Sequence, residues 1–247
     1  MVTMDLFCSK LLPLLDVVCD SQHDSINKAA DICAESIANN GVIHVFGSGH
    51  SVGFGMEMVG QVGSLVPIHT IETSDFVLKG EVTLEQFRDP NIIFERTPNI
   101  ANRLYDLYPI NPNDAFIIIS NSGINGLVID LADTAKQKGH KVIVVTSWQH
   151  TNAEPSRHPS GKKLYEYGDV MIDNCGPRGD ALIETGNIEK VCSVSSITGA
   201  YIAQSIETET ITRLIAKGVN LPVLENPITK QAKKRNEALY AKYKGRI

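Results

Sequence analysis

The sequence predicts an α/β fold in which helices cover both faces of a parallel sheet. Five apolar runs have the length of strands, at residues 42–47, about 66–71, 115–120, 141–146 and 169–173. Helical patterns lie between them, after Ser51, from Ile100 to Leu107 and after Ile124. Parallel strands buried on both faces read as continuous apolar runs, and right-handed crossovers place the intervening helices on the two faces. The alternation therefore favours a doubly covered parallel sheet.

Helices are also expected at the two ends of the chain. Residues 1–40 are expected to form two helices, the second ending at Asn40 and Gly41. Its apolar residues recur on one face, at Ile26, Ala29, Ala30, Cys33 and Ile37. A final long helix is expected from Asn187 to Lys217. Two segments lack clean periodicity, Glu72 to Pro98 and Ser147 to Leu164, and long irregular segments of this kind are often binding loops.

The composition favours a single soluble domain. With 247 residues and 43% hydrophobic content the chain can bury a substantial core. We expect one domain over 1–247, with N-terminal helices at 1–40, an α/β core at 41–217 and a C-terminal tail and helix at 218–247. No apolar run is long enough for a membrane span and no signal peptide is evident, so a cytoplasmic protein is expected, without a membrane partner.

The charge and the cysteines exclude several other classes of protein. The net charge of −5 gives no general attraction to nucleic acid, and the basic C-terminal tail is interpreted as a solvated helix face. Five cysteines without a CxxC pair favour buried thiols over a disulfide framework or a zinc ribbon. No metal-ligand spacing is present, and neither GxGxxG nor GxxxxGK[ST] occurs. We therefore expect no metal and no cofactor.

The most informative residues follow the first and third strands. The first strand runs into Gly47, Ser48, Gly49, His50 and Ser51, and a helix follows. Glycines permit a sharp turn and a close approach of the backbone, and a helix N-terminus presents unpaired N–H groups to an anion. The third strand repeats the pattern, with Ser120, Asn121, Ser122 and Gly123, and the fourth ends in Thr146 and Ser147. Open α/β sheets bind ligands at this edge, so a phosphate site is predicted there.

Longer stretches resemble a known family. The pair GSGHS and SNSG resembles the loops of the sugar isomerase (SIS) domain, a phosphosugar-binding fold. Nearly the whole chain resembles the uncharacterised bacterial UPF0309 family. The segments that carry this resemblance are SNSGINGLVIDLADTAKQKGHKVIVVTS, SRHPSGKKLYEYGDVMIDN, GDALIE and NEALYAKYKGRI. The resemblance implies a flavodoxin-like three-layer α/β/α sandwich with a mainly parallel five-stranded sheet. It also implies a homodimer or higher homo-oligomer of the SIS type, with the site close to the subunit interface.

The resemblance also assigns roles to residues. The serines of the two loops bind the sugar phosphate in SIS domains, which implies that role here for Ser48, Ser51, Ser120 and Ser122. The rest of the predicted phosphate-binding set is Gly47, Gly49, Asn121, Gly123, Thr146 and Ser147. Relatives often carry an arginine where this chain has Gln61 and a DEHN-like sequence where it reads KKRN. If the histidine of that sequence is catalytic in relatives, this chain has lost or changed the activity.

An aldose–ketose isomerisation through an enediol needs a base beside the carbon acid and an acid–base group near the ring oxygen. Glu57 is the preferred base because it lies about one and a half turns into the helix after the first loop. A carboxylate stabilised by the helix dipole is the alternative. His50 is the second catalytic candidate, with a loop cap as its alternative role, while His44 and His69 are expected to be structural.

Further candidates lie outside the two loops. Arg157, His158 and Lys162 can supply cations to a phosphate or can fix a loop or an interface, and Glu184 is a second acid. The function predicted is that of a phosphosugar-binding protein, with aldose–ketose isomerisation as the leading reaction. A non-catalytic phosphosugar sensor or regulatory protein is the alternative, and a dimeric interaction scaffold is a third possibility. Fold-level analogy does not choose among them.

Overall fold

The computed structural model describes residues 1–89, 91, 99–187 and 189–247. Its sheet contains β1 (Ile43–Gly47), β2 (Ile68–Ile71), β3 (Ala115–Ile119), β4 (Lys141–Thr146) and β5 (Val170–Asp173). The strands are all parallel, in the order β2-β1-β3-β4-β5, and they confirm the five strands predicted from the sequence. This is the flavodoxin-like strand order, in which the chain changes direction across the sheet between β1 and β3.

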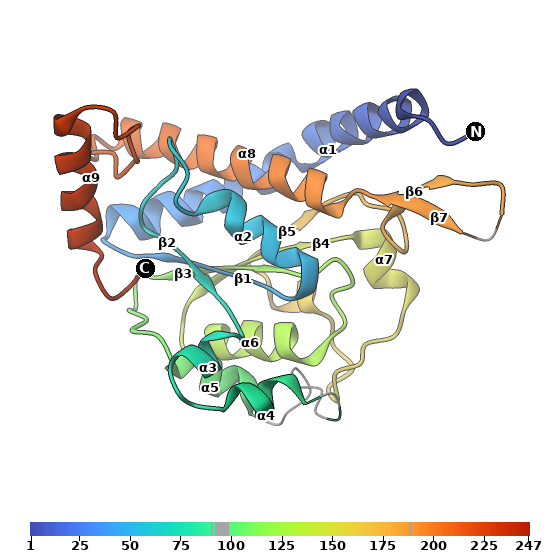
Figure 1. The fold of residues 1–247 in the computed structure, drawn as a ribbon, viewed down its shortest axis with the longest axis horizontal. Coiled ribbons are helices and arrows are strands. Elements are labelled where there is room, and N and C mark those ends of the chain that lie inside the picture. Colours follow the sequence, from blue (N-terminus) through green and yellow to red (C-terminus); the bar gives the residue numbers. More distant parts are fainter. Residues whose placement is uncertain (90, 92–98, 188) are drawn as a thin grey trace.

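Helices cover both faces of the sheet (Figure 1). One face packs against α1 (Met4–Ala38), α2 (Val52–Met58) and α8 (Ser195–Ala216). The other packs against α3 (Asp75–Leu78), α5 (Ile100–Asp106) and α6 (Gly126–Gln137). The other helices among the described residues are η1 (Gly49–Ser51), α4 (Leu84–Arg88), α7 (Trp148–Ala153), η3 (Leu164–Tyr167) and α9 (Lys230–Lys242).

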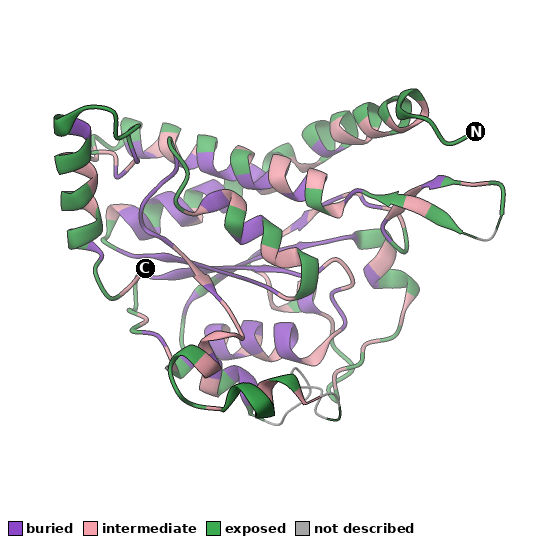
Figure 2. Ribbon diagram, in the orientation of Figure 1, coloured by how far each residue is buried: buried purple, intermediate pink, exposed green. Residues whose placement is uncertain are grey.

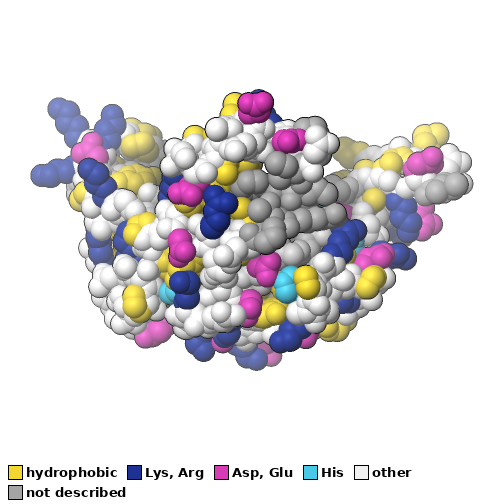
Figure 3. All heavy atoms as spheres, turned by 90° about the horizontal axis from the view of Figure 1, so that it is seen from below, with side chains coloured by type: hydrophobic (Ala, Val, Ile, Leu, Met, Phe, Trp, Pro, Cys, Tyr) yellow, Lys and Arg dark blue, Asp and Glu magenta, His cyan; other side chains and the backbone are white. Residues whose placement is uncertain are grey.

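Two hydrophobic cores arise from the period-two geometry of the strands. Ile117 of β3 points to the α1/α8 face, whereas its neighbours Phe116 and Ile118 point to the α5/α6 face. The central strands β1, β3 and β4 are buried along almost their whole length (Figure 2), as expected for a sheet covered twice, whereas the edge strands β2 and β5 are half-buried. The face seen from below in Figure 3 carries acidic and basic side chains interspersed, outside the part drawn in grey.

The N-terminal prediction of two helices is wrong, because residues 4–38 form the single helix α1. Pro13 lies inside this helix and removes one backbone donor. Pro13 is exposed, so water can satisfy the carbonyl that loses its partner, and the helix continues. The second half of α1 packs on α8 and on the sheet, while its first fourteen residues contain no buried side chain.

The last long helix begins at Ser195 and not at Asn187. Residues before it form an antiparallel hairpin of β6 (Ala181–Glu184) and β7 (Lys190–Ser193). The hairpin projects beside the N-terminal half of α1 (Figure 1). Val191 pairs with Ile183 across the hairpin. Val191 lies within the range of the expected helix, but this pairing places it in a strand. Pairing with a second segment outweighed the local helical pattern.

The two segments expected to be irregular contain short helices. In the segment Glu72 to Pro98, α4 begins with a capping box. The Thr83 side chain accepts from Gln86 N–H, and the Gln86 side chain accepts from Thr83 N–H. In the second, Ser147 caps α7 by accepting from His150 N–H at 3.1 Å. Residues 92–98, which complete the first expected segment, and residue 188 lie outside the described residues.

Candidate functional site

The two loops of the predicted site start side by side. Loop 1, residues 47–51, follows β1, and loop 2, residues 120–123, follows β3. The register pairs Gly47 with Ile119, so both loops leave neighbouring strands at the same level. This point is where the strand order reverses, and the crossovers on its two sides leave opposite faces of the sheet. A crevice therefore opens between the loops at the carboxyl edge of the sheet.

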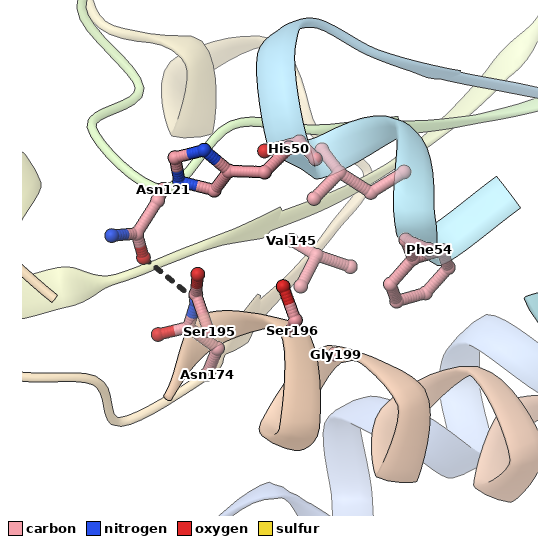
Figure 4. Close-up of a pocket in the computed structure, with 10 residues that line it drawn as sticks. His50, Phe54, Asn121, Val145, Asn174, Ser195, Ser196 and Gly199 are labelled. Carbon is pink, nitrogen blue, oxygen red and sulfur yellow. Dashed lines mark hydrogen bonds between the residues drawn. The ribbon is translucent and has the colours of Figure 1, made fainter. Parts of the chain in front are cut away.

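A pocket occupies the α8 side of this crevice (Figure 4). Loop 1 and α2 form one wall, and the first turn of α8 forms the wall opposite. Asn121 of loop 2 and Asn174, just beyond β5, close one end. The residues lining the pocket are His50, Ser51, Phe54, Ile119, Asn121, Val145, Asn174, Ser195, Ser196 and Gly199. Its polar groups are hydroxyls, amides and an imidazole, and no carboxylate lines it.

Glycine is required at one position of each loop. A Cβ at Gly47 would lie 2.6 Å from the carbonyl oxygen of Ser51, so only glycine permits loop 1 to fold back on itself. Gly123 has φ of +61°, and a Cβ there would lie 2.9 Å from the hydroxyls of both Thr146 and Thr151. The glycines thus hold each loop close to its own neighbouring backbone.

The hydroxyls of the predicted phosphate set fall into two groups. Ser120 accepts from Gly123 N–H at 3.1 Å, Thr146 donates to the carbonyl of Ser120 at 2.7 Å, and Ser147 donates to the carbonyl of Gly176 at 2.6 Å. These three residues are buried and hold the ends of β3 and β4 together. The partly exposed hydroxyls of loops 1 and 2, by contrast, form no hydrogen bond with any residue that the structure describes, and they belong to Ser48, Ser51 and Ser122.

Asn121 is oriented by a chain of hydrogen bonds that the sequence did not suggest. Gly176 N–H donates to Asn174 Oδ1 at 2.9 Å, and Asn174 Nδ2 donates to Asn121 Oδ1, also at 2.9 Å (Figure 4). Asn121 Nδ2 lies 3.5 Å from His150 Nδ1. Because Asn174 must use its oxygen toward Gly176, Asn121 must use its oxygen toward Asn174. The Nδ2 group of Asn121 is therefore left as the outward donor.

Asp180 is a second residue that sequence reasoning missed. It is 7% exposed, and its Oδ1 accepts from the N–H groups of Val194 and Ser195, at 3.2 and 2.8 Å. Its Oδ2 accepts from the Ser195 hydroxyl at 2.7 Å and lies 3.9 Å from Nε2 of the exposed His50. Asp180 therefore caps α8 and faces the histidine of loop 1. The adjacent Gly179–Asp180 pair, with φ of +81° and +70°, was the only local signal.

Glu57 does not line the pocket. It is half-buried in α2, and its Oε1 accepts from Gln204 Nε2 of α8 at 3.2 Å. Beneath it, Glu207 is 4% exposed and accepts from Leu65 N–H. Burial raises the pKa of Glu207 to about 7, the hydrogen bond from Leu65 opposes this rise, and the nearby charge of Glu57 adds to it. The half-buried Glu57 and the buried Glu207 thus influence each other electrostatically, and neither lines the pocket.

The remaining candidates occupy separate places. Arg157 Nη1 donates to Asn125 Oδ1 at 3.2 Å beside loop 2, and His158 lies 2.8 Å from Asp130 of α6. Lys162 Nζ lies over the ring of Tyr167 at 5.3 Å. Glu184 is on the projecting hairpin, where Lys190 at 2.9 Å lowers its pKa, and it does not line the pocket. Of these four residues, only Arg157 contacts Asn125, the N-cap residue of α6.

The two histidines predicted to be structural face each other, with His44 in the buried core and His69 half-buried on the neighbouring strand. His44 is fully buried, with Nε2 3.1 Å from Asp114 Oδ2 and Nδ1 3.3 Å from His69 Nδ1. Burial, with the neighbouring His44, lowers the pKa of His69 to about 4. Arg246, near the C-terminus, also pairs with Asp114. This network lies on strand residues that precede the loops, and it fastens the C-terminal segment to the sheet.

Neither a metal cluster nor a membrane span is found in the described part of the chain. No group of three or more His, Cys, Asp or Glu side chains is arranged there to hold a metal ion. None of the described helices combines the length and the hydrophobicity that crossing a bilayer requires.

Comparison with known proteins identifies the family. The model of the SIS domain matches residues 6–147. A UPF0309 protein of Listeria monocytogenes is 37% identical over 235 residues, covering 95% of this chain and 93% of the relative. A UPF0309 protein of Caldanaerobacter subterraneus is 32% identical and covers 99% and 98%. The chain belongs to the UPF0309 family of SIS-domain proteins.

Solved structures support the fold of this SIS-domain protein. A phosphoheptose isomerase from Neisseria gonorrhoeae aligns with a TM-score of 0.53 at 15% identity, covering 85% of this chain and 95% of that one. A phosphosugar isomerase described as putative, from Bacteroides fragilis, aligns with a TM-score of 0.51 at 17% identity and covers 95% and 97%. At this identity the alignments establish a shared architecture of sheet and helices.

Proposed function

We propose that this SIS-domain protein binds a sugar phosphate across loops 1 and 2. The phosphate lies against the hydroxyls of Ser48, Ser51 and Ser122, and the sugar extends into the pocket lined by His50 and the start of α8. The observation that carries the proposal is the contrast between hydroxyls that hold the loops together and hydroxyls left without a partner among the described residues, at the switch point of the sheet. Hydroxyl and amide donors suit a dianion.

The reaction proposed for the bound sugar is aldose–ketose isomerisation through an enediol. His50 stands at the pocket and faces Asp180, so it is placed to move a proton near the ring oxygen or C2. Glu57 remains the proposed base for the carbon acid, which requires its carboxylate to leave Gln204 and turn toward loop 1.

A non-catalytic sensor is the second candidate. The observation in its favour is that no carboxylate lines the pocket, while the preferred base is hydrogen-bonded to α8 outside it. A site with donors but no poised base binds a phosphosugar without deprotonating it.

One experiment separates these candidates. The protein is screened against pentose, hexose, heptose and amino-sugar phosphates by thermal shift, and each ligand that stabilises it is incubated with it in deuterated water and followed by NMR. Isomerisation predicts product and solvent deuterium at C1 or C2, lost in Glu57→Gln if that carboxylate is the base. Stabilisation without deuterium incorporation supports the sensor, and no stabilisation by any phosphosugar contradicts the binding proposal itself.

We also propose that the protein is a homodimer. The first fourteen residues of α1 have no buried side chain, and the apolar side chains of Met4, Leu12 and Val17 are each more than half exposed, at 77%, 60% and 52%. A two-stranded hairpin is marginally stable alone, and β6–β7 projects beside this helix. A second copy covering the helix and hairpin would bury both. Light scattering on wild type and on the double variant Leu12→Lys, Val17→Lys tests this, with a monomeric wild type as the contrary result.

A further inference from the structure

The segment after α7 is fastened to loop 2 at both of its ends. We name residues 156–164 the strap. Arg157 N–H donates to the carbonyl of Ile124 at 2.9 Å, and Leu164 N–H donates to the carbonyl of Gly123 at 2.9 Å. The strap thus begins and ends on the short stretch of backbone that carries Ser122 and leads into α6. Any ligand held by loop 2 lies next to residues of the strap.

The interior of the strap is held in one shape by polar contacts. Ser156 Oγ donates to the carbonyl of Lys162 at 2.6 Å and accepts from His158 N–H at 3.1 Å. The imidazole of His158 lies between Ser160 Oγ, 2.6 Å from Nδ1, and Asp130 Oδ1, 2.8 Å from Nε2. Both ring nitrogens are occupied and the side chain is 15% exposed. His158 therefore anchors the strap to α6 and is not placed to exchange a proton with a ligand.

Arg157 is the cation that this anchoring presents beside loop 2. Its Nη1 donates to Asn125 Oδ1 at 3.2 Å, and no described carboxylate lies within 4 Å of its guanidinium. Five of the other described arginines are each paired with a carboxylate, namely Arg103, Arg178, Arg213, Arg235 and Arg246, whereas Arg88 of α4 has no such partner among the described residues. A guanidinium has five N–H donors, of which one is used here. In a chain of net charge −5, an exposed guanidinium that uses one of its donors, on Asn125 three residues after Ser122, is suited to an external anion.

Asn125 also leaves hydrogen-bond donors beside loop 2 available to an anion. It is the N-cap residue of α6, yet its side chain makes no capping hydrogen bond, because its Oδ1 faces Arg157. The N-terminal N–H groups of α6 are thus left without the side-chain acceptor that such a position usually supplies. Lys162, the other cation of the strap considered for a phosphate, is turned toward the ring of Tyr167 and serves as a control.

We propose that Arg157 makes this site selective for a phosphate monoester, contacting a phosphate oxygen with its free N–H groups, and that His158 positions it. The inference rests on the proposed function, because it assumes that the phosphate lies on loop 2. A guanidinium forms paired, charge-assisted hydrogen bonds with a terminal phosphate, which offers more free oxygens and more charge than a diester. The substrate class is therefore a sugar with a terminal phosphate, in preference to an unphosphorylated sugar or a nucleotide sugar.

The test compares calorimetric affinities of wild type, Arg157→Met, Arg157→Lys and Lys162→Met. The probes are inorganic phosphate and the sugar phosphate that most stabilises the wild type in the screen above. Arg157→Met is expected to weaken both at least tenfold, Arg157→Lys to retain part of the affinity, and Lys162→Met to stay within twofold of wild type. Wild-type affinity in Arg157→Met overturns the inference alone, whereas absence of binding by the wild type overturns the proposed function together with it.

The positioning role of His158 is tested by a double-mutant cycle. His158→Ala is expected to weaken phosphate binding in the wild-type background but to have no further effect in Arg157→Met, because it acts through the arginine. An equal loss in both backgrounds would show that His158 affects binding by a route independent of Arg157. Thermal melts of all four proteins confirm that each variant is folded at the assay temperature.

Discussion

Replacing Glu207 with glutamine is expected to make the protein less sensitive to alkaline pH. Glu207 is buried between α8 and the segment that follows α2, and its pKa is raised from 4.5 to about 7. A raised pKa means that the folded state holds its proton more tightly than the unfolded state. The resulting stabilisation is present in full below pH 4.5 and is lost as the pH rises through 7.

The magnitude follows from the shift. The rise in the pKa of Glu207 from 4.5 to about 7 corresponds to about 3 kcal/mol once both states are ionised. Between pH 5 and pH 8 the part that changes is about 2–3 kcal/mol, since some of the unfolded chain is already ionised at pH 5. Glutamine cannot ionise, and its amide oxygen can still accept from Leu65 N–H. The variant should therefore gain about 2–3 kcal/mol of stability relative to wild type on moving from pH 5 to pH 8.

Urea unfolding of both proteins at the two pH values measures this double difference, in which the other titrating groups cancel. Glu57→Gln provides a matched control. This variant removes the charge of Glu57, which contributes least to the raised pKa of Glu207. It should therefore reduce the pH dependence of the unfolding free energy by only a fraction. A double difference below about 0.5 kcal/mol for Glu207→Gln would refute the assignment of a buried carboxyl with a raised pKa.

Three further substitutions test the site and its support. Gly123→Ala should lower the free energy of unfolding in urea by about 2–4 kcal/mol, because φ of +61° and two hydroxyls at 2.9 Å oppose a Cβ. Gly161→Ala is the control, since φ there is +73° but the space is open, and it should lower the free energy of unfolding by only about 1–2 kcal/mol. Equal losses in the two variants would contradict the steric argument. Arg246→Met should lower the free energy of unfolding by about 2–3 kcal/mol, because it removes the arginine partner of the buried Asp114, which keeps only His44 and the N–H groups of Val42 and Asn111; a loss under about 1 kcal/mol would be inconsistent with this. Asn174→Asp should turn the Asn121 amide, since the new carboxylate requires a donor, and calorimetry should then show weaker phosphate binding; unchanged affinity would remove Asn121 Nδ2 from the site.

Much of the sheet and both loops were predictable from the sequence because their causes are local. An uninterrupted apolar run of strand length needs burial on both faces, and this placed β1, β3 and β4 correctly. Glycine at 47 and 123 marks turns that no other residue permits, so loops 1 and 2 were recognised without knowledge of their neighbours. The family resemblance added the likeness to SIS domains, which the comparisons confirm.

Other features depend on residues far apart in the chain, and these only the tertiary structure decided. Residues 190–193 are a strand because residues 181–184 lie beside them, and local helical spacing could not indicate that partner. Asn174 and Asp180 enter the site through hydrogen bonds to Asn121 and to the start of α8, and the glycine beside Asp180 was the one local signal for either of them. Glu57 had suitable spacing, but the packing of α2 on α8 turned it toward Gln204. Local chemistry determined which segments form loops and strands, while long-range packing determined which side chains face the crevice between them.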